Sequence, residues 1–227
     1  MKNESPRDIN YHLKMKSSYS ENPEFFDIGV DEAGRGPLFG RVYSAAVVLP
    51  KNDFHHEWMK DSKLIKSEKK MIELSNYIKE NAIHWSIHYC TEKEIDELNI
   101  LQATQKSMKE CISEVLESPK TANLKINLLI DGNYFKPGNF MIKYRQLKEI
   151  ACIKGGDHSY TSIAAASILA KQARDQYIKE LCEENPDLVE KYNIAKNKGY
   201  GAKVHLEGIR NHGITKWHRK SYAPCKI

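Results

Sequence analysis

Four acidic side chains stand at positions where a carboxylate could meet a bound cation. Asp31 and Glu32 follow a short apolar run, Asp131 ends a second one, and Asp157 follows a third. Strand ends in an α/β sheet open onto a common crevice, so these acids can converge although they are far apart in the chain. Taken singly, each acid beside a glycine also fits a turn or a helix cap. Their shared placement is what favours a joint site.

Converging carboxylates predict bound metal. Two carboxylates ~4 Å apart repel by roughly 4 kcal/mol at an effective dielectric near 20, so a cluster of four requires cations. Oxygen ligands select Mg²⁺ or Mn²⁺, and up to four negative charges suit two such ions. A pair of divalent ions is typical of in-line displacement at phosphorus. The acids therefore predict metal-dependent chemistry on a phosphate, on the assumption that folding brings them together.

A glycine-rich segment, Gly34–Gly40, follows the acidic pair directly. Its GxGxxxG spacing and its proline do not match a dinucleotide-binding fingerprint, and it lacks the Lys-Ser/Thr of a Walker loop. Gly34 and Gly36 let backbone amides approach a ligand, and Arg35 adds a charged fork, which suits phosphate or sugar hydroxyls. A tight turn between two strands is the alternative.

Apolar periodicity predicts the elements that must position these residues. We expect strands at 26–30, 42–49, 84–90, 126–130 and 150–153, and helices at 67–82, 99–116 and 161–182. The strands are short apolar or alternating runs, whereas the helices repeat apolar residues at intervals of three and four. The last helix begins with small or apolar residues all round, so its start should be buried. This order predicts an α/β domain with a mixed sheet.

Length, composition and charge bound the organisation of the chain. With 227 residues, 41% hydrophobic and 29% charged, the sequence fits one large folded domain and excludes a disordered or fibrous chain. We expect a flexible or loosely docked extension at 1–24, the main domain at 25–190, and a basic extension at 191–227 packed on the same domain. That last segment has nine Lys and Arg against one acid, Glu207. Such asymmetry is typical of a segment that meets a polyanion, with a solvated basic surface as the alternative.

Several other features exclude common functional classes. Five widely spaced cysteines without a CxxC pair predict reduced thiols rather than disulfides or a zinc knuckle. No stretch reaches the ~20 apolar residues of a membrane span, so we expect a cytoplasmic protein without membrane contact. His84 and His88 have no third ligand nearby in sequence, which favours a half-buried strand over a zinc site. Trp58, Trp85 and Trp217 are expected to pack.

The residues IGVDEAGRGPLFG at 28–40 resemble the N-terminal signature of the ribonuclease HII family. Further motifs of that family follow in its order: DSK at 61–63, IDELNILQAT at 95–104, IDGN at 130–133, KGGD at 154–157 with SIAAASILAK at 162–171, KGYG at 198–201 and HRKSY at 218–222. The match runs from about residue 27 to 224. Six further motifs in the order of the family make this resemblance highly specific.

The resemblance implies an RNase H-like fold, with a central mixed sheet flanked by helices and a helical C-terminal extension. It implies an endoribonuclease of DNA replication and repair that cleaves RNA in RNA/DNA hybrids and cuts 5′ of single ribonucleotides embedded in duplex DNA, leaving 3′-hydroxyl and 5′-phosphate ends. The family's catalytic and metal-binding carboxylates fall on Asp31, Glu32, Asp131 and Asp157, with two Mg²⁺ or Mn²⁺ ions expected in the substrate complex. We expect a monomer.

The same resemblance assigns substrate contacts. They fall on Gly34, Arg35, Gly36, Lys63, Lys198 and Tyr200. The glycines and Arg35 would meet the backbone and the 2′-hydroxyl of the ribonucleotide, the group that distinguishes RNA from DNA. Tyr200 would stack on the deoxyribose that follows, whereas its own sequence context also fits ordinary packing. Phosphate contacts are expected from the basic extension, namely Lys196, Lys198, Lys203, Lys216, Arg219 and Lys220.

Some positions depart from the family's pattern. His158, Ser159 and Tyr160 stand where the family has small residues and a Lys, and Ala202 stands where Thr follows KGYG. The related ribonuclease HIII has an N-terminal domain of its own and a Glu as its fourth carboxylate. This chain instead has a predominantly polar segment at 1–24 and Asp157 as the fourth carboxylate.

Two alternatives belong to other functional classes. A non-catalytic hybrid-binding protein would show no Mg²⁺-dependent cleavage, and a phosphatase or DNA-only nuclease would ignore the 2′-hydroxyl.

Overall fold

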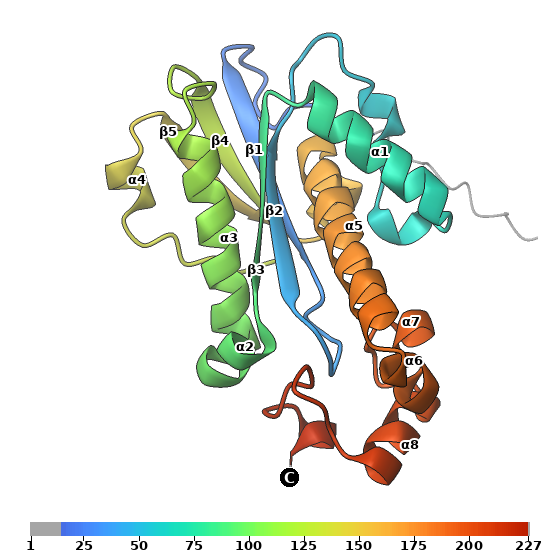
Figure 1. The fold of residues 1–227 in the computed structure, drawn as a ribbon. Helices are drawn as coiled ribbons and strands as arrows, with labels where there is room; N and C mark the ends of the chain where they lie inside the picture. Colours follow the sequence, from blue (N-terminus) through green and yellow to red (C-terminus); the bar gives the residue numbers. More distant parts are fainter. Residues whose placement is uncertain (1–14, 227) are drawn as a thin grey trace, which may run out of the picture.

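A mixed sheet of five strands forms the centre of the structure, a computed structural model that describes residues 15–226 (Figure 1). The strands are β1 (Phe25–Ala33), β2 (Val42–Val48), β3 (His84–Cys90), β4 (Lys125–Asp131) and β5 (Leu147–Ile153). They lie in the order β3-β2-β1-β4-β5. β2 is antiparallel to β1 and β3, whereas β1, β4 and β5 are parallel to one another. The predicted mixed sheet is confirmed.

Helices cover both faces of this sheet. They are α1 (Glu68–Asn81), α2 (Glu92–Leu98), α3 (Ile100–Glu117), α4 (Phe140–Lys143), α5 (Thr161–Glu184), α6 (Asp187–Tyr192), α7 (Ile194–Asn197) and α8 (Lys203–His212). α3 packs on one face, and α5 with α1 packs on the other (Figure 1). The short helices α6, α7 and α8 gather beyond the C-terminal end of α5. None of the described helices is long and apolar enough to cross a membrane.

Alternating residues of the strands build a separate core on each face. Ile28 and Val30 of β1 pack with Ile112 of α3. Ala45 and Val47 of β2 face the other way and pack against α5 and α1. Ala46 and Val48 of the same strand pack on the α3 side, so β2 alone supplies both layers, because neighbouring strand residues point to opposite faces. This two-sided burial fixes the register of β1 and therefore the places of the acids at its end.

Gly29, in the middle of β1, lets α5 approach the sheet closely. A Cβ atom at this position would lie 2.1 Å from the carbonyl carbon of Ser162 and 2.3 Å from the amide nitrogen of Ile163. Every residue from Thr161 to Ala170 is buried, as the sequence predicted for the start of this helix. The contact between β1 and α5 therefore depends on small residues on both sides.

The first strand extends further than the sequence predicted. β1 continues past Val30 through Asp31 and Glu32 to Ala33, because these residues pair with β2. The acids therefore lie within a strand instead of following one. The last strand likewise begins at Leu147, not at residue 150, and the sequence did not predict α2 or α4.

Both ends of the described chain contact the central domain. Of the predicted extension 1–24, residues 1–14 lie outside the described residues. Lys16 donates its N–H to the Ser159 carbonyl and accepts from the N–H of Thr161. At the other end, Leu188 and Ile194 pack with Phe39, which lies in the loop after β1. Segment 191–226 is therefore held against the loop that carries the glycines.

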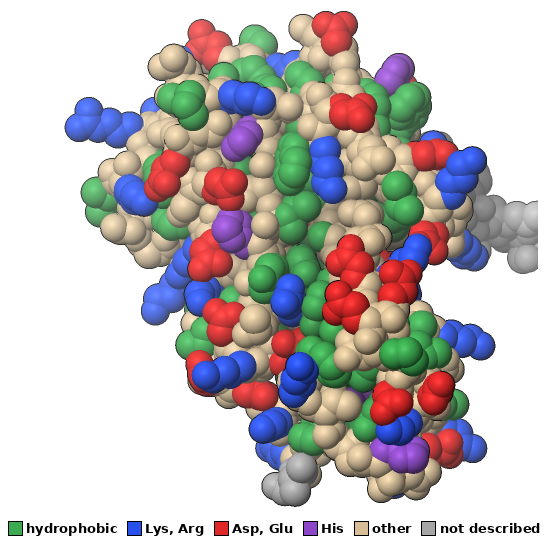
Figure 2. All heavy atoms as spheres, viewed as in Figure 1, with side chains coloured by type: hydrophobic (Ala, Val, Ile, Leu, Met, Phe, Trp, Pro, Cys, Tyr) green, Lys and Arg blue, Asp and Glu red, His purple; other side chains and the backbone are tan. Residues whose placement is uncertain are grey.

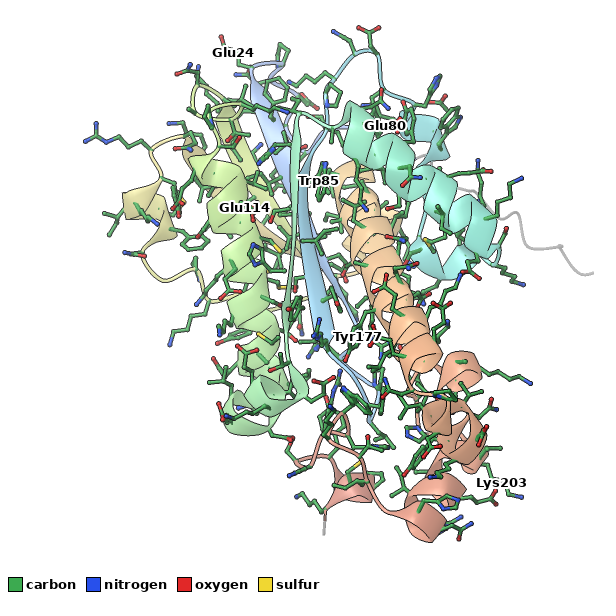
Figure 3. The ribbon with its side chains drawn as sticks, in the orientation of Figure 1. Glu24, Glu80, Trp85, Glu114, Tyr177 and Lys203 are labelled. Carbon is green, nitrogen blue, oxygen red and sulfur yellow. The ribbon has the colours of Figure 1, made fainter. Side chains whose placement is uncertain are left out.

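Trp58 packs as expected, but at the surface. It is 43% exposed and stacks on His55 with ring centroids 4.2 Å apart. His88 lies on a half-exposed strand as expected, and its Nε2 lies 2.7 Å from the carboxylate of Glu114 on α3. Figure 3 shows Glu114 on α3, the helix that covers this face of the sheet. All five cysteines have free thiols.

Candidate active site

Asp31 and Asp131 lie next to each other across two parallel strands. Val30 pairs with Ile130 in the register of β1 and β4, so the following residue on each strand is an acid. Asp31 is only 5% exposed and accepts a hydrogen bond at Oδ1 from the N–H of Glu32 at 2.7 Å. The parallel pairing, which forms between segments a hundred residues apart, is what brings these two carboxylates together.

The turn after β5 supplies the remaining acid. Gly156–His158 form a single short helical turn, and the Gly156 N–H donates to Asp131 Oδ1 at 2.7 Å. Asp157 is 2% exposed, and its Oδ2 accepts from Lys63 Nζ at 3.1 Å. This turn therefore contacts Asp131 through its backbone and carries the fourth carboxylate beside it.

Most of the predicted site residues line one pocket. Its lining is Asp31, Glu32, Ala33, Gly34, Arg35, Gly36, Ser62, Lys63, Asp131, Ser167, Lys171, Arg174 and Tyr200. Asp157 lies at its edge, bound to Lys63. Lys198 does not line this pocket but an adjoining hollow between α1 and α5, which shares Lys171 with it. The structure thus gathers three carboxylates, the glycine segment, Lys63 and Tyr200 around one space.

Burial and mutual repulsion make these carboxylates hard to ionise. Desolvation, followed by repulsion from Glu32 and Asp131, raises the pKa of Asp31 well above its ordinary value. Desolvation also raises the pKa of Glu32, which Arg35 opposes by donating from Nη1 to Oε1 at 3.1 Å. The pKa of Asp131 is raised by desolvation and then by Asp157. A bound cation would relieve the same repulsion, so the pocket favours cations.

The predicted four acids do not form the tightest group of potential metal ligands. Within residues 15–226, three such atoms approach within 4.8 Å of one another at Asp61, Asp157 and His158. His158 Nε2 lies 3.4 Å from Asp61 Oδ2 and 3.8 Å from Asp157 Oδ1. His158, a departure from the family's pattern, therefore touches the edge of the site. Another departure, Ala202, stands before α8 and provides no side-chain cap.

Tyr200 lies beside the glycine segment. Its side chain is 52% exposed, and its ring comes within 3.5 Å of the position that a Cβ atom of Gly36 would occupy. An exposed aromatic ring at the rim of a pocket is available to a ligand, in contrast to the ordinary packing that its sequence context also allowed.

One predicted phosphate contact is wrong. Arg219 is 0% exposed, because its guanidinium donates to backbone carbonyls of the glycine segment inside the protein. It cannot reach a phosphate in solution. Among the other members of that set, Lys196, Lys203, Lys216 and Lys220 are exposed.

The sequence analysis missed three residues of the pocket that lie on α5. Ser167, Lys171 and Arg174 are spaced by four and three residues, so they share one face of the helix. The buried part of α5 is otherwise almost entirely apolar, and this polar stripe was a signal that could have identified them. Ser167 also contacts the DSK segment, since its hydroxyl lies 2.9 Å from that of Ser62.

Comparisons with known proteins agree with this geometry. The sequence profile of the family described as Ribonuclease HII matches residues 28–225. A ribonuclease HII of Parabacteroides distasonis is 45% identical over 86% of this chain and 89% of its own length. A ribonuclease HII of Vibrio parahaemolyticus is 42% identical over 91% of this chain and 89% of its own.

Solved structures share the fold. One is the PCNA:RNase HII complex from Archaeoglobus fulgidus, with a TM-score of 0.65 and 23% identity over 87% of this chain and 95% of that chain. Another is Bst-RNase HIII in complex with Mn²⁺, with a TM-score of 0.69 and 16% identity over 89% of this chain and 68% of that chain. At these identities the likeness establishes the RNase H-like fold. The profile match and the curated relatives establish more: this chain belongs to the ribonuclease HII family.

Proposed function

We propose that this RNA-cleaving, metal-dependent hydrolase acts on RNA/DNA hybrids and on duplex DNA with single embedded ribonucleotides. It would cut on the 5′ side of the ribonucleotide and leave 3′-hydroxyl and 5′-phosphate ends. The observation that carries this proposal is one pocket that combines buried carboxylates with a glycine segment and an exposed tyrosine. The acids suit chemistry on a phosphate, and the glycine segment and the tyrosine suit recognition of a sugar.

The donor set of the pocket fits Mg²⁺ or Mn²⁺. The candidate ligands are carboxylate oxygens of Asp31, Glu32, Asp131 and Asp157, and hard divalent cations prefer oxygen. Burial and neighbouring carboxylates raise the pKa values of the first three, so a bound cation would favour their ionised forms. Two divalent ions held there would supply the charge that activates an attacking water and stabilises the leaving oxygen in an in-line displacement.

The chain's own residues would orient the substrate around these acids. Lys63 keeps Asp157 in place through their 3.1 Å ion pair and is otherwise exposed towards solvent, where it can meet a phosphate. The backbone of Gly34–Gly36 would hydrogen-bond the 2′-hydroxyl, a group that can both donate and accept. Tyr200 would stack on the next sugar, which would make the enzyme sensitive to the junction between RNA and DNA.

We also propose that the protein works in the cytosol as a monomer. Five free thiols, four of them buried, suit a reducing compartment.

The decisive test is Asp131→Asn. This change keeps the volume and the acceptor for the Gly156 N–H but removes a charge from the pocket, so cleavage should fall by roughly 100-fold or more while duplex binding persists. The assay uses an end-labelled DNA duplex bearing one ribonucleotide, incubated with Mg²⁺, Mn²⁺ or chelator, with the product ends mapped.

Asp53→Asn is the matched control, because Asp53 is exposed and outside the pocket. It should cleave like the unaltered protein. Full Mg²⁺-dependent turnover by Asp131→Asn would refute the assignment of the acids. The unaltered protein is also incubated with an all-DNA duplex of the same sequence. Equal cleavage of that duplex would favour a nuclease that is indifferent to the 2′-hydroxyl. No cleavage of either duplex would favour a non-catalytic binding protein.

A further inference from the structure

Two buried arginines lie behind the glycine loop (residues 34–40). Arg174 on α5 is 2% exposed, and Arg219 in the segment after α8 is fully buried. Within residues 15–226 neither guanidinium forms an ion pair with a carboxylate, and both donate to backbone carbonyls instead. Burying a cation without a counter-charge is strongly unfavourable. Hydrogen bonds to buried carbonyls offset only part of this cost, so stability alone is a weak reason for arginine at either position.

Arg219 holds both ends of the glycine loop. Its hydrogen bonds run from Nη2 to the Gly34 carbonyl at 2.6 Å, from Nη1 to the Arg35 carbonyl at 2.9 Å and from Nε to the Gly40 carbonyl at 2.8 Å. The Tyr222 hydroxyl donates to the same Arg35 carbonyl at 2.6 Å and accepts from Arg219 Nη1 at 3.0 Å. A planar guanidinium can bind several carbonyls at once, which a lysine ammonium does less well.

Arg174 connects the glycine loop to the segment that carries Tyr200. Its Nη2 donates to the Phe39 carbonyl at 3.2 Å and to the Lys198 carbonyl at 2.9 Å. It also packs against Gly34, whose φ of +96° and missing side chain leave room for the guanidinium; a Cβ atom there would lie 2.3 Å from Arg174 Nε. One side chain thus sets the spacing between two loops that line the pocket.

The two arginines bind carbonyls and leave amides free. The N–H groups of Gly34, Arg35 and Gly36 have no acceptor within residues 15–226, although all three residues line the pocket beside the acids. Pro37, the next residue, has no N–H. Three consecutive unpaired donors beside a polar pocket are a site for an oxygen of a ligand.

We propose that Arg174 and Arg219 are positioning residues for ribonucleotide recognition. By holding the carbonyls of the glycine loop from behind, they present its amides to the 2′-hydroxyl and the backbone oxygens of the ribonucleotide and keep Tyr200 at a fixed distance from them. The inference rests on the proposed function. It adds that discrimination between ribose and deoxyribose depends on two buried side chains that act through the backbone of the glycine loop.

The test compares the affinity for a DNA duplex bearing one ribonucleotide with that for the same sequence in all-DNA form, both measured in chelator. Arg219→Lys, Arg174→Lys and Tyr222→Phe should each lower the ratio of the two affinities by about two- to tenfold, the effect of weakening one hydrogen bond. The all-DNA affinity should stay unchanged. Arg210→Lys, an exposed conservative change on α8, is the matched control and should leave the ratio intact.

A purely structural role would lower the melting temperature and leave the ratio unaltered, so circular dichroism melting accompanies each measurement. If the arginine variants fail to fold, Tyr222→Phe decides, because it removes only a hydroxyl from a partly buried ring. An unaltered ratio in folded variants, or an equal fall in both affinities, would overturn the inference alone. Absence of any ribonucleotide preference in the unaltered protein would overturn the proposed function as well.

Discussion

At the scale of single residues, the site is defined by charges that the fold holds in an unfavourable place. Asp31 is buried next to Glu32 and Asp131, and desolvation followed by their repulsion raises its pKa well above the ordinary value. Such groups destabilise the folded state whenever they are ionised. Clustered buried carboxylates with this property are typical of functional sites rather than of structural ion pairs.

This predicts a pH-dependent effect of Asp31→Asn on stability in chelator. Below the unfolded pKa of about 3.8 Asp31 is protonated in both states, and as the pH rises towards its raised folded pKa the folded wild type loses stability. The asparagine has no carboxylate to ionise, so the variant should be more stable than the wild type at neutral pH. Urea denaturation between about pH 4 and 8 measures the difference in unfolding free energy.

Added Mg²⁺ should reduce the difference in unfolding free energy between the variant and the wild type. A cation binds the ionised pocket of the wild type more tightly than that of the variant and therefore stabilises the wild type more. Asp53→Asn serves again as the exposed control. A difference in unfolding free energy that does not change with pH would contradict the raised pKa of Asp31.

At the scale of elements, the packing of α5 on β1 positions the site. Gly29 lies two residues before Asp31, and α5 carries Ser167, Lys171 and Arg174 to the pocket. The close approach at Gly29 therefore sets the distance between the strand with the acids and the helix with the basic residues. A change in this contact should alter stability and activity together.

Gly29→Ala is the corresponding prediction. The new methyl group would clash with the backbone of Ser162, which cannot move without shifting α5, so the unfolding free energy should fall by about 3 kcal/mol or more. Cleavage by the protein that remains folded should also fall, as measured by activity per folded molecule. Gly138→Ala, where nothing lies within 4 Å, should cost only about 1 kcal/mol for its positive φ. Similar losses in both variants would show that β1–α5 packing is not critical.

The same elements show what sequence can and cannot predict here. Strand and helix periodicities are local, so β3, α1 and the buried start of α5 were predicted almost to the residue. The extension of β1 to Ala33 was not, because it depends on pairing with β2, which local pattern does not encode. Arg219 was assigned to the surface since a basic residue in a basic segment normally lies there. Only tertiary structure shows the carbonyls that hold it inside.

At the scale of the whole molecule, charge is distributed unevenly along the chain but mixed on the face that Figure 2 shows. Segment 191–227 has nine of the 35 Lys and Arg and a single acid. On the face that Figure 2 shows, basic and acidic side chains nevertheless alternate, and Figure 3 places Lys203 on α8, at the end of the molecule beyond the sheet. Lys203 also lies 3.9 Å from Glu207. Net charge alone therefore does not identify the surface that binds the duplex, and individual lysines must be tested.

Replacing Lys196 and Lys203 together with alanine should weaken binding of the ribonucleotide-bearing duplex and of the all-DNA duplex by the same factor. Both side chains are exposed and lie on the C-terminal segment that carries Tyr200. If each contacts one phosphate, the slope of log affinity against log salt should become less steep by roughly 1.8. Binding titrations at several salt concentrations give this slope.

Lys120→Ala is the control and should leave the slope unchanged. Lys120 follows the end of α3 that is distant from α8 (Figure 1). An unaltered slope in the double variant would exclude this segment as the anchor. A loss confined to the ribonucleotide duplex would instead place these lysines with the residues that recognise the sugar, because phosphate contacts cannot distinguish the two duplexes.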